Sequence, residues 1–161
     1  MKALVFSDSH RFVTNMQYII GTYGKNMDCV LHLGDGFEDV EKLSREFPDL
    51  RFEWVCGNCD HSSEPAEKLL ILGGKRIFIT HGHKYHVKSG YQRVVYAALE
   101  KEADACFFGH SHQPAYFYEN GILFLNPGSI SIPSGQLLPS YGVVDISESR
   151  VWGEICWKQD T

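Results

Sequence analysis

Five apolar runs in this sequence each end in a short polar segment that carries histidine, aspartate or asparagine. The polar segments are Asp8-Ser9-His10, Gly34-Asp35, Gly57-Asn58-Cys59-Asp60, His81-Gly82-His83 and Gly109-His110-Ser111-His112. Imidazoles, carboxylates and amide oxygens are side-chain groups that bind divalent cations in proteins. Five unrelated loops would not be expected to repeat this arrangement by accident, so we interpret them as parts of one site.

The first half of the chain alternates between strand-like and helix-like patterns. Buried strands are predicted over residues 2–6, 29–33 and 52–56, with helices over residues 12–23 and 37–47. In the first helix the apolar residues at helical spacing are Phe12, Met16, Ile19, Ile20 and Tyr23. A β-α-β-α-β order implies parallel strands with right-handed crossovers, and sites in such sheets form beyond the carboxyl ends of the strands. The first three polar segments lie at those ends.

The second half is dominated by predicted strand pairs. The dipeptides Gly73-Gly74 and Asn120-Gly121 are typical of hairpin turns, and they lie between apolar runs at 69–72, 76–80, 115–118 and 122–125. A helix is predicted over 90–101, a buried strand over 105–108, and a last strand pair at 141–146 and 151–157. Three helices and about nine strands favour two packed sheets with helices on the outside.

Length and charge narrow the classes of protein that this chain can belong to. With 161 residues, of which 43% are hydrophobic, we expect one globular domain over residues 1–161. A net charge of -5 argues against a broad surface for duplex nucleic acid, whereas bound divalent cations would locally reverse the sign and favour a small anionic substrate. We expect a cytoplasmic protein without membrane contacts, because we find neither a signal-peptide pattern nor an apolar run near the ~20 residues that span a bilayer. Homo-oligomer formation is left open.

The cysteines suggest one alternative that does not involve a metal. Their number is odd, which does not favour a disulfide framework; they are Cys29, Cys56, Cys59, Cys106 and Cys156. Cys56 and Cys59 form a C-x-x-C pair near Trp54, and a thioredoxin-type redox motif has that spacing. The redox interpretation leaves the other four polar segments unexplained.

Taken together, the five polar segments resemble the calcineurin-like metallophosphoesterase superfamily. Its pattern is D-x-H, G-D, G-N, H-G and G-H-x-H, each at a strand end, and this chain carries all five in that order. The resemblance extends to Asn126-Pro127-Gly128-Ser129 and is strongest for the compact bacterial and archaeal phosphodiesterase branch. It implies an α/β fold, a four-layer α-β-β-α sandwich of two mixed sheets flanked by helices.

The resemblance also implies two divalent metal ions with assigned ligands. Asp8, His10 and His112 would hold the first ion, Asn58, His81 and His110 the second, and Asp35 would bridge them. Oxygen and imidazole donors suit Mn²⁺, which we favour, and also Ni²⁺, Fe²⁺, Zn²⁺ or Mg²⁺. The implied activity is hydrolysis of a phosphate ester, with a phosphodiester favoured, by attack of a metal-bridging hydroxide.

The predicted catalytic residues are Asp35, Asn58, Cys59 and His83. Many relatives carry a histidine directly after G-N as the general acid for the leaving group, and here that position is Cys59. A thiol could donate this proton, or it could be a thiolate beside a metal ion. His83 is a second residue that could contact the substrate phosphate, whereas His32, within a strand, is interpreted as a hydrogen-bonded core residue.

Simpler interpretations exist for single residues and for the whole chain. Asp8 and Asp35 each precede a predicted helix and could be N-caps, and Asn58 could be a turn residue. For the whole chain the alternative is a binding scaffold without catalysis, like the retromer-subunit relatives, in which the metal site is degraded. All seven ligand positions are retained here, which favours an enzyme.

Overall fold

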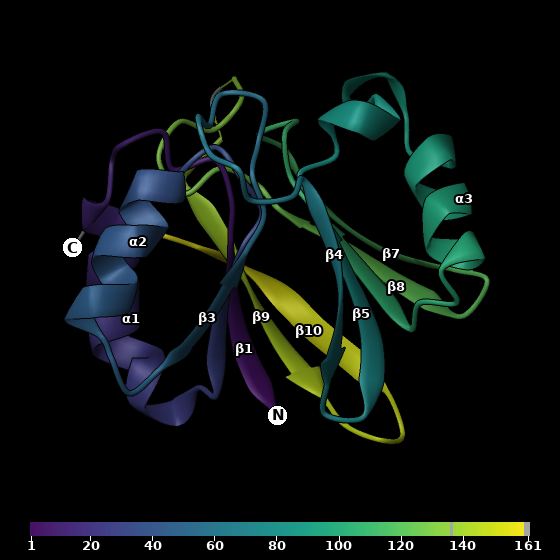
Figure 1. Ribbon diagram of the computed structural model, residues 1–161, viewed down its shortest axis with the longest axis horizontal. Helices are drawn as coiled ribbons and strands as arrows, with labels where there is room; N and C mark the ends of the chain where they lie inside the picture. The colour runs from purple at the N-terminus through teal and green to yellow at the C-terminus, as the bar shows by residue number, and fades with distance from the viewer. Residues whose placement is uncertain (136, 160–161) are drawn as a thin grey trace.

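The computed structural model describes residues 1–135 and 137–159. Two five-stranded sheets face each other at its centre (Figure 1). The first sheet has the order β10-β9-β1-β2-β3 and contains β1 (Lys2–Phe6), β2 (Cys29–His32), β3 (Arg51–Trp54), β9 (Ser140–Ile146) and β10 (Val151–Trp157). Strands β1, β2 and β3 pair in parallel, as predicted, and the β9–β10 hairpin extends the sheet on the other side of β1.

The second sheet has the order β4-β5-β6-β8-β7. Its strands are β4 (Glu67–Leu72), β5 (Lys75–Thr80), β6 (Ala105–Phe108), β7 (Pro114–Glu119) and β8 (Ile122–Pro127). Strands β5, β6 and β8 are parallel, and β4 and β7 pair antiparallel at the two edges. Both predicted hairpins are confirmed, and each of the ten predicted strand ranges corresponds to one of the ten strands in the described residues.

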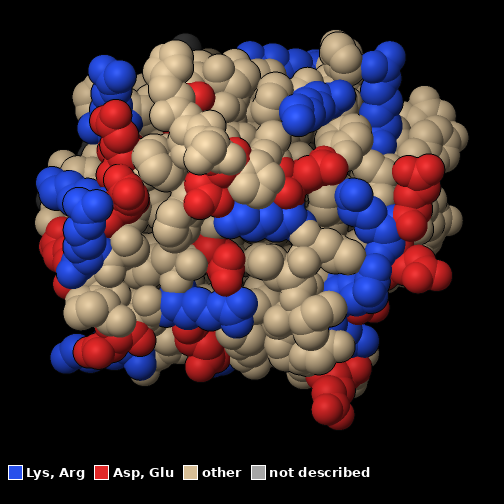
Figure 2. Space-filling model, viewed as in Figure 1, with Lys and Arg blue, Asp and Glu red and all other residues tan. Residues whose placement is uncertain are grey.

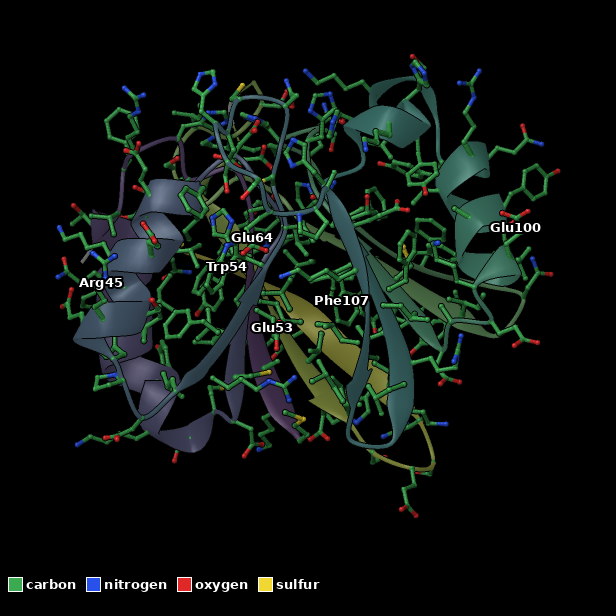
Figure 3. All side chains as sticks on the ribbon, viewed as in Figure 1. Arg45, Glu53, Trp54, Glu64, Glu100 and Phe107 are labelled. Atoms are coloured by element: carbon green, nitrogen blue, oxygen red, sulfur yellow. The ribbon has the colours of Figure 1, made fainter. Side chains whose placement is uncertain are left out.

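Alternation along the central strands produces the layers, because successive side chains of a strand point to opposite faces. Ala3 and Val5 of β1 lie in the core between the sheets, together with Phe107 of β6, which is labelled in Figure 3. Leu4 and Phe6 point the other way, against helices α1 (Thr14–Tyr23) and α2 (Phe37–Glu46). Helix α3 (Gln92–Glu100) covers the outer face of the second sheet. The predicted four-layer α-β-β-α sandwich is therefore confirmed.

The prediction for the first helix was wrong about its beginning. The helix begins at Thr14, and Phe12 lies before it with 62% of its surface exposed. Residues Asp8, His10 and Arg11 all have positive φ, which a helix cannot accommodate, and Phe12 N–H donates to Ser9 O within a turn. Tyr23, the last residue of the helix, is also exposed.

The predicted third strand was too long at its carboxyl end. It ends at Trp54, although Val55 and Cys56 are buried as expected. Val55 N–H still donates to His32 O, but Cys56 N–H turns away and donates to Pro65 O. The chain thus leaves the sheet two residues early, before Gly57-Asn58-Cys59-Asp60.

Among the helices of the described residues, none has the length and apolar character that a membrane-spanning helix requires.

Candidate metal centre

The segments that follow β1, β2, β3, β5 and β6 converge at one end of the two sheets, the upper edge in Figure 1. Five candidate ligands in these segments have left-handed backbone conformations: φ is 56° at Asp8, 46° at His10, 57° at Asp35, 71° at His110 and 57° at His112. Such conformations cost about 1–3 kcal/mol for a non-glycine residue and cluster at functional sites. The backbone is therefore held in a strained form where the side chains meet.

The first group of donors is formed by Asp8, His10 and His112, whose donor atoms lie within 4.8 Å of one another. Asp8 Oδ2 accepts hydrogen bonds from Ser7 Oγ at 2.6 Å and from His110 N–H at 3.0 Å. Asp8 Oδ1 is buried and has no hydrogen-bond partner among the described residues. It faces His112 Nε2 at 3.3 Å and His10 Nε2 at 3.7 Å. A buried carboxylate oxygen without a partner is costly, which a bound cation would relieve.

The second group lies around His81, at the end of β5. His81 Nδ1–H donates to Leu33 O at 2.7 Å, which fixes the tautomer and leaves Nε2 free to act as a ligand. That Nε2 lies 3.0 Å from Asn58 Oδ1 and 3.2 Å from His110 Nδ1. His112 is oriented in the same way, since its Nδ1–H donates to Ile132 O at 2.7 Å.

Asp35 lies between the two groups. Its Oδ1 accepts a hydrogen bond from Cys59 N–H at 2.8 Å. Its Oδ2 is 3.3 Å from His81 Nε2 and 3.6 Å from His10 Nε2. One carboxylate oxygen thus faces a histidine of each group, which is the position that a shared ligand requires. The structure brings all seven predicted ligand residues together, with donor atoms that fit a pair of divalent cations.

The charges of the site support the same interpretation. Burial opposes ionisation of Asp8, but the nearby imidazoles of His10 and His112 outweigh it and hold its pKa below the usual range. Burial also opposes protonation of His81, but the Asp35 hydrogen bond and the Asp8 charge raise its pKa. At His110, burial and the charge of His81 lower the pKa to about 4. Burial also opposes ionisation of Asp35, but the hydrogen bond and the charge of His81 lower its pKa. Two buried carboxylates thus stay ionised at the centre of the site, which favours the binding of cations.

Sequence reasoning missed the part played by Asp60. Its Oδ2 accepts hydrogen bonds from Asp35 N–H and Gly57 N–H, both at 2.8 Å. Its Oδ1 accepts from Gly36 N–H at 3.0 Å and Phe37 N–H at 3.1 Å. The carboxylate therefore binds the amino-terminal end of α2 and ties the Asp35 loop to the Asn58 loop. Its place beside Asn58 and Cys59 was the only available signal.

A second buried network holds the loop of Asp8 and His10. Gly34 N–H donates to His32 Nδ1 at 3.2 Å, so His32 Nε2–H faces Ser9 Oγ at 3.0 Å, and Ser9 Oγ donates to Asp39 Oδ2 at 2.6 Å. Arg11 N–H also donates to Asp39 Oδ2. His32 is a hydrogen-bonded core residue, as predicted, and burial lowers its pKa to about 4. Ser9 and Asp39 carried no comparable signal in the sequence.

The end of β8 and the segment that follows it support the same loop from the other side. Ser129 Oγ donates to Asp8 O at 2.8 Å, and Ser131 Oγ donates to Ser9 O at 2.8 Å. Asn126 Nδ2 donates to Gly109 O at 3.1 Å. Gly109 must itself be a glycine, because a Cβ there would overlap Ser7 Oγ. These contacts place residues 126–131 directly beside the loops of Asp8 and His110.

Cys59 and His83, the two residues proposed for leaving-group or substrate contacts, lie on different sides of the centre. The Cys59 side chain is exposed, and its sulfur belongs to a third group of donors with His10 and Asp35. Burial and the charge of Asp35 raise its pKa. His83 lies in a short 3-10 helix, His83–Tyr85, with its ring 5.3 Å from that of His81 and 6.1 Å from that of His110. Burial lowers its pKa.

Comparison with known proteins agrees with this geometry. Residues 1–149 match the model of the calcineurin-like phosphoesterase superfamily domain. The probable metallophosphoesterase YsnB of Bacillus subtilis is 34% identical over 148 residues, covering 91% of this chain and 85% of that protein. The phosphodiesterase YfcE of Escherichia coli is 35% identical over 102 residues, covering 56% of this chain and 50% of YfcE.

Solved structures extend the comparison to the fold. A conserved protein of Streptococcus pneumoniae, described as a predicted phosphoesterase, has a TM-score of 0.82 and 33% identity, covering 97% of this chain and 88% of that one. Vps29 of Entamoeba histolytica in complex with zinc has a TM-score of 0.77 and covers 98% of this chain and 99% of its own, but at 20% identity it shows the fold alone. From the match over residues 1–149 we conclude that the chain belongs to the calcineurin-like phosphoesterase superfamily.

Proposed function

We propose that this protein is a phosphodiesterase with a two-cation centre. The observation that carries the proposal is the pair of buried aspartates. Asp8 Oδ1 has no hydrogen-bond partner among the described residues, and Asp35 Oδ2 faces both His10 and His81. A purely structural role for these residues would leave a buried charged oxygen unsatisfied.

The donor set assigns a place to each cation. Asp8, His10 and His112 would hold the first, Asn58, His81 and His110 the second, and Asp35 would be shared. These donors are oxygen and nitrogen atoms, which suits Mn²⁺, the ion that we favour, as well as Ni²⁺, Fe²⁺, Zn²⁺ and Mg²⁺. When bound, such a pair supplies Lewis-acid polarisation of the phosphate and a water nucleophile that is active near neutral pH.

Two hollows beside the centre favour a diester over a monoester. One is lined by His10, Asp35 and Cys59 together with Arg11 and Phe37. The other is lined by His112 and Ser111 together with Lys88 and Tyr91. Both hollows join candidate ligands to one cationic and one aromatic side chain, and the first is also lined by three further carboxylates, those of Glu38, Asp39 and Asp60. A phosphodiester has two organic substituents, and each could occupy one hollow while the phosphate lies between them.

The surface charge is consistent with a small substrate. Figure 2 shows Lys and Arg side chains interspersed with Asp and Glu over the face that it presents. Such a mixture does not resemble the continuous basic surface that duplex nucleic acid requires. The cytoplasmic location and the absence of membrane partners stay predictions from the sequence.

The chain offers two candidates for protonation of the leaving group. Cys59 opens onto the first hollow beside Asp35, and its raised pKa keeps the sulfur protonated, as a donor requires. His83 has its ring beside His81 and His110. Its lowered pKa makes it a neutral imidazole at neutral pH, which suits contact with substrate better than proton donation.

Hydrolysis of two chromogenic esters tests the proposal. After incubation with Mn²⁺, the protein should cleave bis-p-nitrophenyl phosphate, and the metal-free protein should not. Asp8→Asn should lower kcat/KM by at least ~10²-fold, because the site loses half of its buried charge. Asp49→Asn, at an exposed position after α2, is the matched control and should match the wild type. Cleavage of p-nitrophenyl phosphate alone would refute the diester preference.

The alternative, a non-catalytic scaffold, rests on fold similarity to Vps29. The unsatisfied Asp8 oxygen and the complete donor set favour the enzyme. A folded protein that binds no divalent cation and cleaves neither ester would support the scaffold instead.

A further inference from the structure

The Cys59 sulfur lies at the open side of the first group of donors. The donor atoms of His10, Asp35 and Cys59 are all within 4.8 Å of one another. Two of these three residues already belong to the proposed pair of cation positions, and His10 Nε2 also faces the unpartnered, buried Asp8 Oδ1 at 3.7 Å. The sulfur therefore lies within 4.8 Å of two donors of the first cation position, and Cys59 borders the hollow of Arg11 and Phe37.

The backbone holds this sulfur in place. Cys59 N–H donates to Asp35 Oδ1 at 2.8 Å, and Asn58 Nδ2 contacts the sulfur at 3.7 Å. The next residue, Asp60, fixes the same turn through its hydrogen bonds to Gly57 N–H and Asp35 N–H. Although Cys59 is exposed, hydrogen bonds of Cys59 itself and of Asp60 tie its loop to the loop of Asp35. Its position beside His10 and Asp35 is therefore built into the fold.

A thiolate ligand changes which metal ions a site of oxygen and imidazole donors prefers to bind. Carboxylate, carbonyl and water oxygens suit Mn²⁺ and Mg²⁺, whereas thiolate ligands select softer ions such as Zn²⁺. Oxygen and imidazole donors alone leave the first position open to all of these ions. One sulfur donor beside them would favour the thiophilic ions there.

We propose that Cys59 is a metal ligand for thiophilic divalent cations, which it binds together with His10 and Asp35 at the first cation position. Binding forms one metal–sulfur bond and releases the thiol proton to solvent. With Mn²⁺ or Mg²⁺ the thiol stays free and faces the hollow. The two kinds of ion thus produce two different forms of the site, one with a free thiol beside the substrate hollow and one without. This inference rests on the proposed function, since it uses the same first position.

X-ray absorption at the zinc edge tests the ligand directly. Zinc-substituted wild-type protein should show a sulfur scatterer at about 2.3 Å, besides the shorter distances to nitrogen and oxygen. Cys59→Ser should lose the sulfur shell and still bind zinc through the remaining donors. Cys156→Ser, which changes a half-buried cysteine on β10, is the matched control and should keep the shell. A wild-type spectrum without sulfur, or a shell that survives in Cys59→Ser, would overturn the proposal.

Thiol labelling provides a second measurement that does not depend on X-ray absorption. Cys59 is the exposed cysteine of the five, so a water-soluble disulfide reagent should label it first. Saturating Zn²⁺ should slow this labelling roughly tenfold or more, because a coordinated thiolate is no longer a free nucleophile, and Mn²⁺ should change it less than twofold. Equal protection by both ions would contradict the inference. If zinc binds without sulfur, only this inference fails; if no cation binds at all, the proposed function fails with it.

Discussion

Asp60 offers a sharp test of how the loops of the centre are held. Its carboxylate accepts four backbone hydrogen bonds, two at Oδ2 from Asp35 and Gly57 and two at Oδ1 from Gly36 and Phe37. In Asp60→Asn only one oxygen remains, and the new NH₂ group faces N–H groups to which it cannot bond. At least two of the four bonds are therefore lost, with little change in side-chain volume.

The expected loss in the free energy of unfolding follows from these lost hydrogen bonds. A hydrogen bond to a charged acceptor contributes about 1.5–3 kcal/mol, so the loss of two predicts about 3–6 kcal/mol. Asp60 is half-buried, and water can reach part of the site, which places the expected loss at about 3 kcal/mol. Because a domain of this size loses about 2–4 °C in Tm for each kcal/mol, Tm should fall by about 6–12 °C.

Denaturation by urea in the presence of a chelator measures this loss without a contribution from bound cations. Asp49→Asn changes the same pair of functional groups at an exposed site and should stay within about 0.5 kcal/mol of the wild type. Mn²⁺ affinity should also fall in Asp60→Asn, because Asp35 lies in the loop that is released. A loss below about 1 kcal/mol with unchanged Mn²⁺ affinity would show that Asp60 does not hold the loops.

Three further predictions concern other residues of the site. Asp35→Asn keeps the shape of the side chain but removes a charge that both cations would share, so kcat/KM for a diester should fall at least ~10²-fold. A folded variant with nearly full activity would exclude the bridging role. Cys59→His should introduce a better proton donor near neutral pH. Hydrolysis of esters with poor leaving groups should become faster, and hydrolysis of nitrophenyl esters should stay nearly unchanged. A wild-type rate that does not depend on the pKa of the leaving group would show that another residue donates the proton. Burial lowers the pKa of His32 to about 4 in the folded protein, whereas its pKa in the unfolded chain is about 6.5. Between these two pH values only the unfolded chain binds a proton, so the free energy of unfolding of the wild type should fall by up to about 3 kcal/mol as pH decreases from about 6.5 to about 4. His32→Asn, measured by urea denaturation of the metal-free protein, should lack this part of the pH dependence, and an identical pH profile in both proteins would contradict the assigned pKa shift.

The layers of the fold could be predicted because the relevant signals are local. Alternation in β1 places Ala3 and Val5 on one face and Leu4 and Phe6 on the other, and both faces are buried. A short run that is apolar at every position favours a strand that is buried on both faces, whichever elements cover it. The order of strands and helices then restricts the pairing of β1, β2 and β3.

The boundaries next to the centre could not be predicted in the same way. Phe12 continues the apolar spacing of α1, but the loop before it takes left-handed conformations at Asp8, His10 and Arg11. Those conformations are stabilised by contacts with distant segments, such as Asp8 O with Ser129 Oγ and Arg11 N–H with Asp39 Oδ2. Local propensity contains no information about partners so far away in the sequence.

The same reason separates the residues that were recognised from those that were missed. The seven candidate ligands share a chemistry and a place at strand ends, which a sequence displays. Asp60, Ser9 and Asp39 act through hydrogen bonds to segments 23 to 30 positions away, which only the folded chain displays. His32 lies in between, because its place inside a strand predicted a buried role but not its contact with Ser9.

Metal content is the most direct test of the central claim that the chain builds a two-cation centre. The protein should be treated with chelator, incubated with Mn²⁺, freed of unbound metal and then measured by elemental analysis. We expect roughly two ions per chain in the wild type and roughly one in His81→Ala, which removes a donor from the second position only. Wild-type protein that retains only trace metal, or no more than one ion per chain, would contradict the two-cation centre.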